Sequence, residues 1–171
     1  LSEMAPAMRH AIVAVEDERF YEHWGIDPRG IVRAAVNNVW YGKVKQGAST
    51  LTQQLVRQLV LGTERTLKRK IIEAISAVRL ELTLSKDEIL ERYLNLVYFG
   101  RGAYGVAAAA RTYFDKKAID LTPIETALLA GLVQAPGRYR PFEDPGPSLQ
   151  RRAHDFAANG CRRIFETRGG R

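Results

Sequence analysis

The sequence predicts a fold that is almost entirely α-helical, with little or no sheet. Apolar residues recur at intervals of three and four in successive segments, which is the spacing of one helix face. Several of these segments begin with residues that commonly cap helix N-termini. No two segments combine strand alternation with the turn residues of a β-hairpin. The 171 residues, 46% of them hydrophobic, suffice for a single domain with a sizeable core.

The first half of the chain is expected to contain four helices. The first runs from Pro6 to about residue 17, and the second follows the N-cap Asp27 to about residue 41. The third is capped by Ser49 and ends at residue 62, and the fourth begins at Thr63. The apolar stripe of the fourth helix comprises Leu67, Ile71, Ala74, Ile75, Val78 and Leu82.

The second half predicts shorter helices separated by glycine and proline. Ser85 and Glu88 form a capping box, and so do Thr122 and Glu125. Between them, an alanine-rich helix ends near residue 114. The helix after Thr122 stops before Pro136, an irregular segment follows, and a basic helix is expected over about 148–166.

Composition excludes several classes of site. Because Cys161 is the sole cysteine, an internal disulfide and a cysteine-based zinc site are both excluded. The three histidines are too scattered for a metal-binding pair. The net charge of +7 favours an anionic partner, which can be nucleic acid, anionic lipid or a phosphorylated substrate. No apolar run approaches the roughly 20 residues of a membrane span.

Glu16 is the first candidate catalytic residue. It follows Ile12 by four residues, so it lies on or beside the apolar face, in the last turn of the first helix. Burial and the negative end of the helix both disfavour an ionised carboxylate, and a general base working near neutral pH needs such an environment. The alternative is a solvated glutamate at a frayed helix end. His23 by itself is more typical of a structural hydrogen bond.

A polar stripe follows the loop at Gly47. Ser49, Gln53 and Arg57 are spaced by four residues, and helix N-termini bind anions through their free amide groups. Basic residues that follow, together with Arg57, can hold a diphosphate; they are Arg65, Arg69 and Lys70. The alternative is a solvated helix face. Glu73 lies four residues after Arg69, so it is either the partner in a helix ion pair or a second active-site carboxylate.

Five motifs in order resemble those of the peptidoglycan glycosyltransferase domain of bifunctional penicillin-binding proteins and of monofunctional transglycosylases. The resemblance covers roughly residues 10 to 140. Its motifs are Glu16, Asp17, Phe20, His23 and Gly25; Gly47 to Gln54; Arg69, Lys70 and Glu73; Ile89 to Asn95, continuing to Phe114; and Ala130 to Leu132, ending at Pro136. At Arg57 many members of this family carry lysine, which keeps the charge.

The resemblance implies a lysozyme-like all-α domain that polymerises lipid II with inversion and releases undecaprenyl diphosphate. It implies that Glu16 is the general base and that Glu73 orients or stabilises the donor. Arg57 and Arg65 resemble a diphosphate clamp, while Asp17 and His23 brace the segment around Glu16. The residues that resemble the lining of the sugar and phosphate subsites are Ser49, Gln53, Gln54, Arg69, Lys70 and Tyr113.

The resemblance also carries expectations about partners. We expect residues 1–171 to be one domain taken from a longer, membrane-anchored chain at the outer face of the bacterial cytoplasmic membrane. Residues 24–45 mix aromatic, apolar and basic side chains, which suits either a lipid interface or a core helix. A divalent cation such as Mg can assist the diphosphate by family analogy, although no metal-ligand spacing is evident. A C-terminal transpeptidase domain in the parent chain is compatible with these residues, which lack its sequence motifs.

Two other functions fit parts of the sequence. A lytic glycosidase acting on peptidoglycan can use one glutamate on a similar fold, but it has little need for the cluster of basic residues. A nucleic-acid-binding module fits the net charge and the basic C-terminal segment. It leaves the acidic first motif and the Ser/Thr/Gln stripe unexplained, so we expect no nucleic-acid partner.

Overall fold

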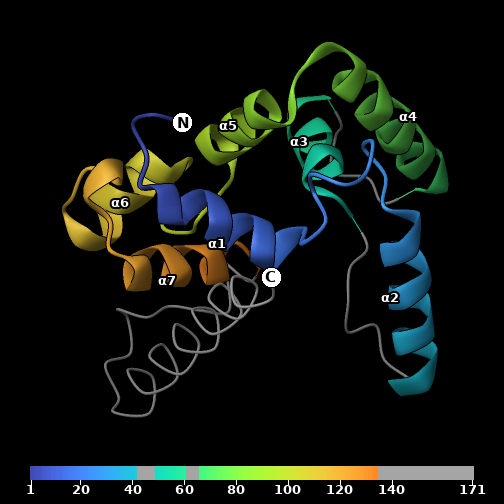
Figure 1. Cartoon of the computed structure of the whole chain (residues 1–171), viewed down its shortest axis with the longest axis horizontal. Helices are drawn as coiled ribbons and strands as arrows, with labels where there is room; N and C mark the ends of the chain where they lie inside the picture. Colours follow the sequence, from blue (N-terminus) through green and yellow to red (C-terminus); the bar gives the residue numbers. More distant parts are fainter. Residues whose placement is uncertain (42–48, 61–65, 135–171) are drawn as a thin grey trace, which may run out of the picture. The chain divides into compact units, whose positions relative to one another are not determined.

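Seven α-helices and one short 3-10 helix make up the part of the chain that the computed structural model describes, residues 1–41, 49–60 and 66–134 (Figure 1). Within these ranges no strand forms, and the all-α prediction is confirmed. The expected basic helix near the C-terminus lies outside the described residues. The helices are α1 (Pro6–Glu16), α2 (Pro28–Tyr41), α3 (Leu51–Val60), α4 (Leu67–Thr83), α5 (Lys86–Leu96), α6 (Val106–Phe114), η1 (Ala118–Asp120) and α7 (Pro123–Gln134).

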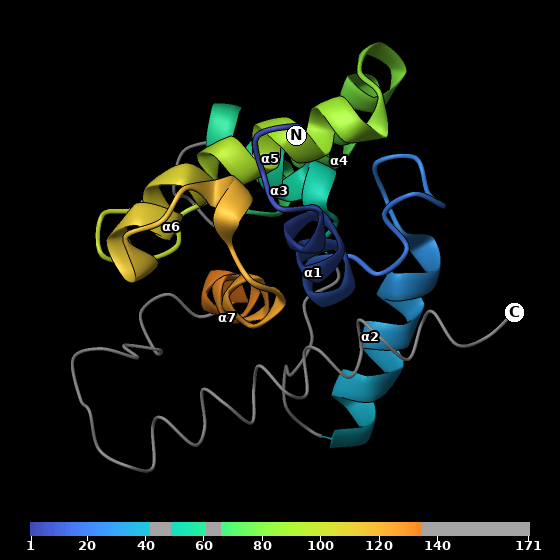
Figure 2. The same ribbon diagram turned by 60° about the vertical axis from the view of Figure 1, so that its left-hand side comes forward.

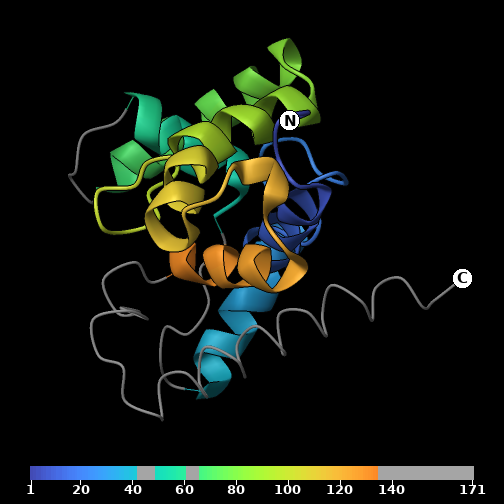
Figure 3. The same cartoon turned by 90° about the vertical axis from the view of Figure 1, so that its left-hand side faces the viewer.

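The chain divides into two compact units, Leu1–Glu18 with Leu94–Arg171, and Arg19–Tyr93. In the first unit α1 packs along α7, and the two helices lie side by side in Figures 1 and 2. Met8 and Ile12 of α1 are fully buried, as are Leu129 and Ala130 of α7. Each fully buried Met, Ile or Leu side chain contributes about 1.5–3 kcal/mol. Figure 3 turns α6 and α7 of the same unit toward the viewer.

The second unit is built around α3 and α4, which pack against each other. Leu51 and Leu55, one turn apart on α3, are fully buried. Phe20 is also fully buried, and its ring meets that of Tyr21 edge-on at 5.1 Å. The chain preceding α2 therefore buries an aromatic side chain without forming a helix.

Local capping signals were mostly confirmed. The Ser85 N–H donates to Glu88 Oε2 at 2.8 Å, and the Thr122 N–H donates to Glu125 Oε2 at 2.8 Å. The helix expected to start at Thr63 starts instead at Leu67, because Thr66 accepts a hydrogen bond from the Arg69 N–H and serves as the N-cap.

Helix α4 presents its apolar stripe outward, which hydrophobic periodicity did not indicate. Leu67 and Ile71 are 85% and 61% exposed, and Ile75 and Leu82 are exposed as well. The buried positions are Glu73, Ala77 and Glu81, again spaced by four. The physical reason is that both carboxylates have cationic partners, so the charged face can be buried at acceptable cost.

Candidate active site

Glu16 is the last residue of α1, in the helical turn where the sequence predicts it. Its side chain is half-buried, and its Oε1 atom is shielded from solvent. Ile12, one turn earlier, is fully buried, so the carboxylate lies beside the apolar face. Asp17 is buried and ends the helix, with its N–H donating to the Val13 carbonyl at 2.9 Å.

In the second unit, the segment from Arg19 to Asp27 is fixed by polar contacts. The Arg19 guanidinium forms a hydrogen-bonded ion pair with the Asp27 carboxylate. This contact lowers the pKa of Asp27 from 3.8 to about 2, with a smaller contribution from the Gly30 N–H, while burial opposes the shift. Asp27 immediately precedes α2, as predicted. His23 is buried, with its ring centroid 6.3 Å from that of Phe20.

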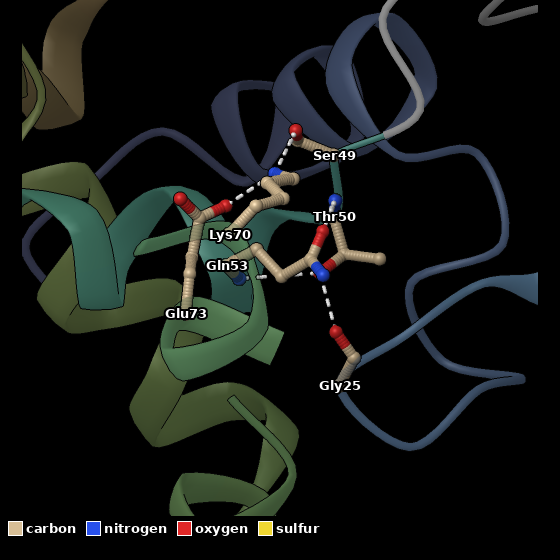
Figure 4. A network of polar contacts seen from close by, with 6 residues as sticks. All are labelled: Gly25, Ser49, Thr50, Gln53, Lys70 and Glu73. Atoms are coloured by element: carbon tan, nitrogen blue, oxygen red, sulfur yellow. Dashed lines mark hydrogen bonds and ion pairs between the residues drawn. The ribbon is translucent and has the colours of Figure 1, made fainter. Parts of the chain in front are cut away.

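The start of α3 is capped by Thr50 and not by Ser49, the residue the sequence favoured (Figure 4). The Gln53 N–H donates to Thr50 Oγ1 at 3.2 Å, and the Thr50 N–H donates to Gln53 Oε1 at 3.1 Å. This reciprocal pair is a capping box with glutamine at its third position. Thr50 Oγ1 also donates to the Gly25 carbonyl at 2.6 Å, which joins the first motif to α3.

With its capping role taken by Thr50, Ser49 is available for a different contact. Its Oγ accepts a hydrogen bond from Lys70 Nζ at 2.9 Å (Figure 4). The same ammonium lies 2.5 Å from Oε1 of Glu73, a side chain with no solvent exposure, whereas the Lys70 side chain is 47% exposed. Glu73 therefore pairs with Lys70, three residues earlier on the helix. Among the described residues, Glu73 Oε2 has no hydrogen-bond partner.

This arrangement fixes one cation at the surface of the second unit. The ammonium contacts a buried carboxylate and a hydroxyl, and the Lys70 side chain as a whole is 47% exposed. A cation positioned in this way can stabilise negative charge on a leaving group with little reorganisation.

The other predicted residues fall in several places. In the second unit, Gln54 Oε1 accepts from the Tyr93 hydroxyl at 3.2 Å, and Arg57 lies half-exposed in the last turn of α3. Arg69 is half-exposed on α4, and Arg65 lies outside the described residues. In the first unit, the buried Tyr113 hydroxyl donates to the Phe99 carbonyl at 2.9 Å. The second unit thus brings together Ser49, Gln53, Lys70 and Glu73, while Glu16, Asp17 and Tyr113 belong to the first.

The sequence did not single out Lys86, which contacts the first motif, or Glu81, which pairs with Lys86. The sequence signal for Glu81 is its spacing from Glu73, which puts both acidic residues on one face of the helix.

Across residues 1–41, 49–60 and 66–134, no group of three or more histidine, cysteine or acidic side chains is placed to hold a metal ion. None of the described helices has the length and apolar character needed to cross a membrane.

Comparison with known proteins gives a consistent result. The family model described as transglycosylase matches residues 1–158. Penicillin-binding protein 1A of Neisseria flavescens is 48% identical over 147 residues, which is 86% of this chain and 18% of the relative. Penicillin-binding protein 1A of Aquifex aeolicus is 53% identical over 143 residues, or 84% of this chain and 20% of the relative. The chain therefore spans about a fifth of the length of these curated relatives.

Proposed function

This chain belongs to the transglycosylase family, and we propose from this that it is a peptidoglycan glycosyltransferase that polymerises lipid II into glycan strands. The GlcNAc 4-hydroxyl of the acceptor attacks C1 of the donor MurNAc, and undecaprenyl diphosphate leaves. One bond forms as the other breaks, so the α-linked donor becomes a β-1,4 link. The reaction needs a base for the hydroxyl proton and cations for the leaving diphosphate.

In this proposal Glu16 is the general base. Its carboxylate belongs to the last turn of a helix, beside a fully buried isoleucine, and one of its oxygens is shielded from water. Partial desolvation and the negative helix end both favour taking up a proton. Asp17 and His23 are both buried. We propose that they brace the segment that follows Glu16.

The observation that carries the proposal is the placement of Lys70. Its ammonium is fixed between the Ser49 hydroxyl and the fully buried Glu73 carboxylate, and it stays accessible to an anion. We assign it, with Arg57, Arg65 and Arg69, to the diphosphate of the donor. Gln53, Gln54 and Tyr113 are proposed to line the sugar and phosphate subsites. Glu73 fixes Lys70, so it acts on the donor through that cation.

The cationic cluster also favours glycosyl transfer over lysis of glycan strands. A lytic glycosidase must protonate a glycosidic oxygen, whereas a diphosphate departs readily once its charge is neutralised. Lys70, fixed by Glu73, supplies a cation that a leaving diphosphate needs and that lysis does not. The glycosyltransferase is therefore the better supported function.

We further propose that α2 meets the membrane that carries the substrate. The chain's two tryptophans, Trp24 just before α2 and Trp40 on it, are 70% and 83% exposed. Val32 and Val36 of α2 are exposed as well. Helix α2 contains no acidic residue. Exposed aromatic and apolar side chains beside arginines suit the interface of an anionic bilayer. We place this contact at the outer face of the cytoplasmic membrane.

Incubation of the protein with lipid II tests the proposed reaction. Growth of glycan polymer with release of undecaprenyl diphosphate supports the transferase. Shortening of preformed glycan strands, with no polymer formed from lipid II, supports the lytic enzyme and overturns the proposal. A control reaction that contains preformed strands but no donor distinguishes strand cleavage from polymerisation.

A further inference from the structure

A second buried carboxylate lies on the face of α4 that carries Glu73. Glu81 is two turns further along the helix, and its side chain is only 2% exposed. Its Oε1 accepts hydrogen bonds from Thr52 Oγ1 at 2.6 Å and from Lys86 Nζ at 2.8 Å. Lys86 Nζ is also 2.8 Å from Oε2. A buried carboxylate is stable only with partners of this kind.

Lys86 extends this contact to the first motif. Its Nζ donates to the His23 carbonyl at 2.6 Å and lies 4.6 Å from the centroid of the Phe20 ring. One ammonium therefore binds a carboxylate, a backbone carbonyl and an aromatic face. Such an ammonium group is held by charge, hydrogen bonding and cation–π attraction together.

These contacts connect three parts of the second unit. Phe20 and His23 belong to the first motif, Thr52 to α3, and Glu81 to α4. The Ser49–Lys70–Glu73 network joins α4 to the residue just before Thr50, the N-cap of α3. Glu73 and Glu81 are about 12 Å apart along the axis of α4. The segment that follows Glu16 is thus tied to the helices that hold the proposed diphosphate site.

We propose that Glu81 and Lys86 are positioning residues, which hold the segment from Phe20 to His23 in a single conformation on α3 and α4. Phe20 follows Glu16 by only four residues, so fixing Phe20 limits the freedom of the chain that carries the base. The proposal rests on the proposed function, because it gives this anchoring a role in glycosyl transfer. Neither residue touches substrate; both act through the first motif.

The test compares Lys86→Met, which keeps the apolar stem but removes the charge, with Lys86→Arg and Glu81→Gln. A matched control is Lys116→Met, because Lys116 pairs with Glu125 at 2.7 Å in the first unit and has no described contact with the first motif. We measure kcat and KM for lipid II polymerisation, the folded fraction by circular dichroism, and amide hydrogen exchange over residues 20–25.

For Lys86→Met, we expect kcat to fall about tenfold, because small displacements near a reacting group are costly, with KM within about twofold. Amide exchange over residues 20–25 accelerates, while exchange in α7 is unchanged. Lys86→Arg restores most of the rate. The double variant Glu81→Gln/Lys86→Met has a kcat no lower than that of the more damaging single variant. Lys116→Met keeps the wild-type kcat.

The proposal is overturned if Lys86→Met matches the Lys116→Met control in kcat and in exchange over residues 20–25. It is also overturned if the loss of rate disappears after correction for the folded fraction. If the wild-type protein forms no polymer, the proposed function fails instead. In that case unchanged exchange in Lys86→Met would still disprove the anchoring, and faster exchange confined to residues 20–25 would support it.

Discussion

The Nζ atom of Lys70 lies 2.5 Å from Oε1 of Glu73, and the Glu73 side chain is completely buried. Replacing Lys70 with alanine therefore leaves a buried carboxylate without its cation. Because Lys70 is itself half-exposed, we expect a loss of about 1–3 kcal/mol in unfolding free energy, less than for a fully buried pair. Thermal unfolding measures this loss.

The same substitution should raise KM for lipid II at least about tenfold, since a charge-assisted contact with the donor is lost. Lys70→Arg, which retains the charge, is the companion variant and should lose less. An unchanged KM in Lys70→Ala, at a temperature where the variant is folded, would show that this ammonium does not bind the donor.

The half-buried carboxylate of Glu16 gives the second prediction. Glu16→Gln keeps the shape of the side chain but cannot accept the hydroxyl proton, so kcat should fall by at least about a hundredfold. Glu22→Gln is the control, because Glu22 is exposed on the chain that follows and should retain full activity. Near-normal polymerisation by Glu16→Gln would show that another group is the base.

A third prediction concerns stability at acidic pH. The folded-state pKa of Asp27 is about 2 instead of 3.8, chiefly because Arg19 donates a hydrogen bond to the carboxylate. Since the pKa is lowered on folding, this contribution to stability is present above about pH 4 and is lost as the pH falls toward 2. After allowance for partial exposure of the pair, we expect about 1–2 kcal/mol.

Asp27→Asn isolates this contribution because asparagine is also a good N-cap. The difference in unfolding free energy between wild type and variant, followed by urea denaturation, should shrink between pH 4 and pH 2. Glu88 and Glu125 also have lowered pKa values, but both proteins contain them, so their effects cancel in the difference. A difference that does not vary over this range would argue against the ion pair.

Sequence reasoning succeeded where the interaction is local. In the capping boxes at Ser85 and Thr122, the bonded residues are three positions apart, so the pattern contains the whole interaction. It failed at α4 because hydropathy does not register the ion pairs with Lys70 and Lys86 that allow the face of Glu73 and Glu81 to be buried, nor contacts from remote segments. Thr52 is 29 residues from Glu81, and no hydropathy pattern encodes that contact.

The candidate site shows the same difference between interactions that are local in sequence and interactions that are remote. The position of Glu16 at the end of a helix follows from the spacing of its own segment. The contact between Ser49 and Lys70 spans 21 residues, and only the resemblance to a known family placed the two residues in one site. Capping preference favoured Ser49 over Thr50, because both residue types cap well and the competing contact with Lys70 was invisible in the sequence.

The fourth prediction concerns the proposed membrane face. Because Trp24 and Trp40 are the only tryptophans, the fluorescence of the chain reports directly on this segment. Adding vesicles that contain anionic phospholipid should shift the emission to shorter wavelength, and Trp40→Ser should bind the vesicles more weakly in co-sedimentation. Ile124→Ser removes an exposed apolar residue from α7 and should bind like wild type. Equal binding by the two variants would place the lipid contact elsewhere.

The last prediction separates backbone strain from close packing at Gly25. This residue has a φ of +76°, and an added Cβ atom would lie 2.8 Å from the backbone of Ala77 and Val78 on α4. Gly102 has a similar φ of +77°, but an added Cβ there meets no atom within 4 Å. Gly102→Ala should therefore cost only the conformational strain, about 1 kcal/mol. Gly25→Ala adds a clash with backbone atoms that cannot rotate away, so we expect about 3 kcal/mol or more.

Thermal or urea unfolding of the two variants measures the difference. Because the Gly25 carbonyl also accepts the Thr50 hydroxyl, a shift at Gly25 should disturb the start of α3 and lower polymerisation as well. Gly102→Ala should leave polymerisation unchanged. Equal destabilisation by the two substitutions would mean that the close approach of Gly25 to α4 contributes nothing beyond its backbone conformation.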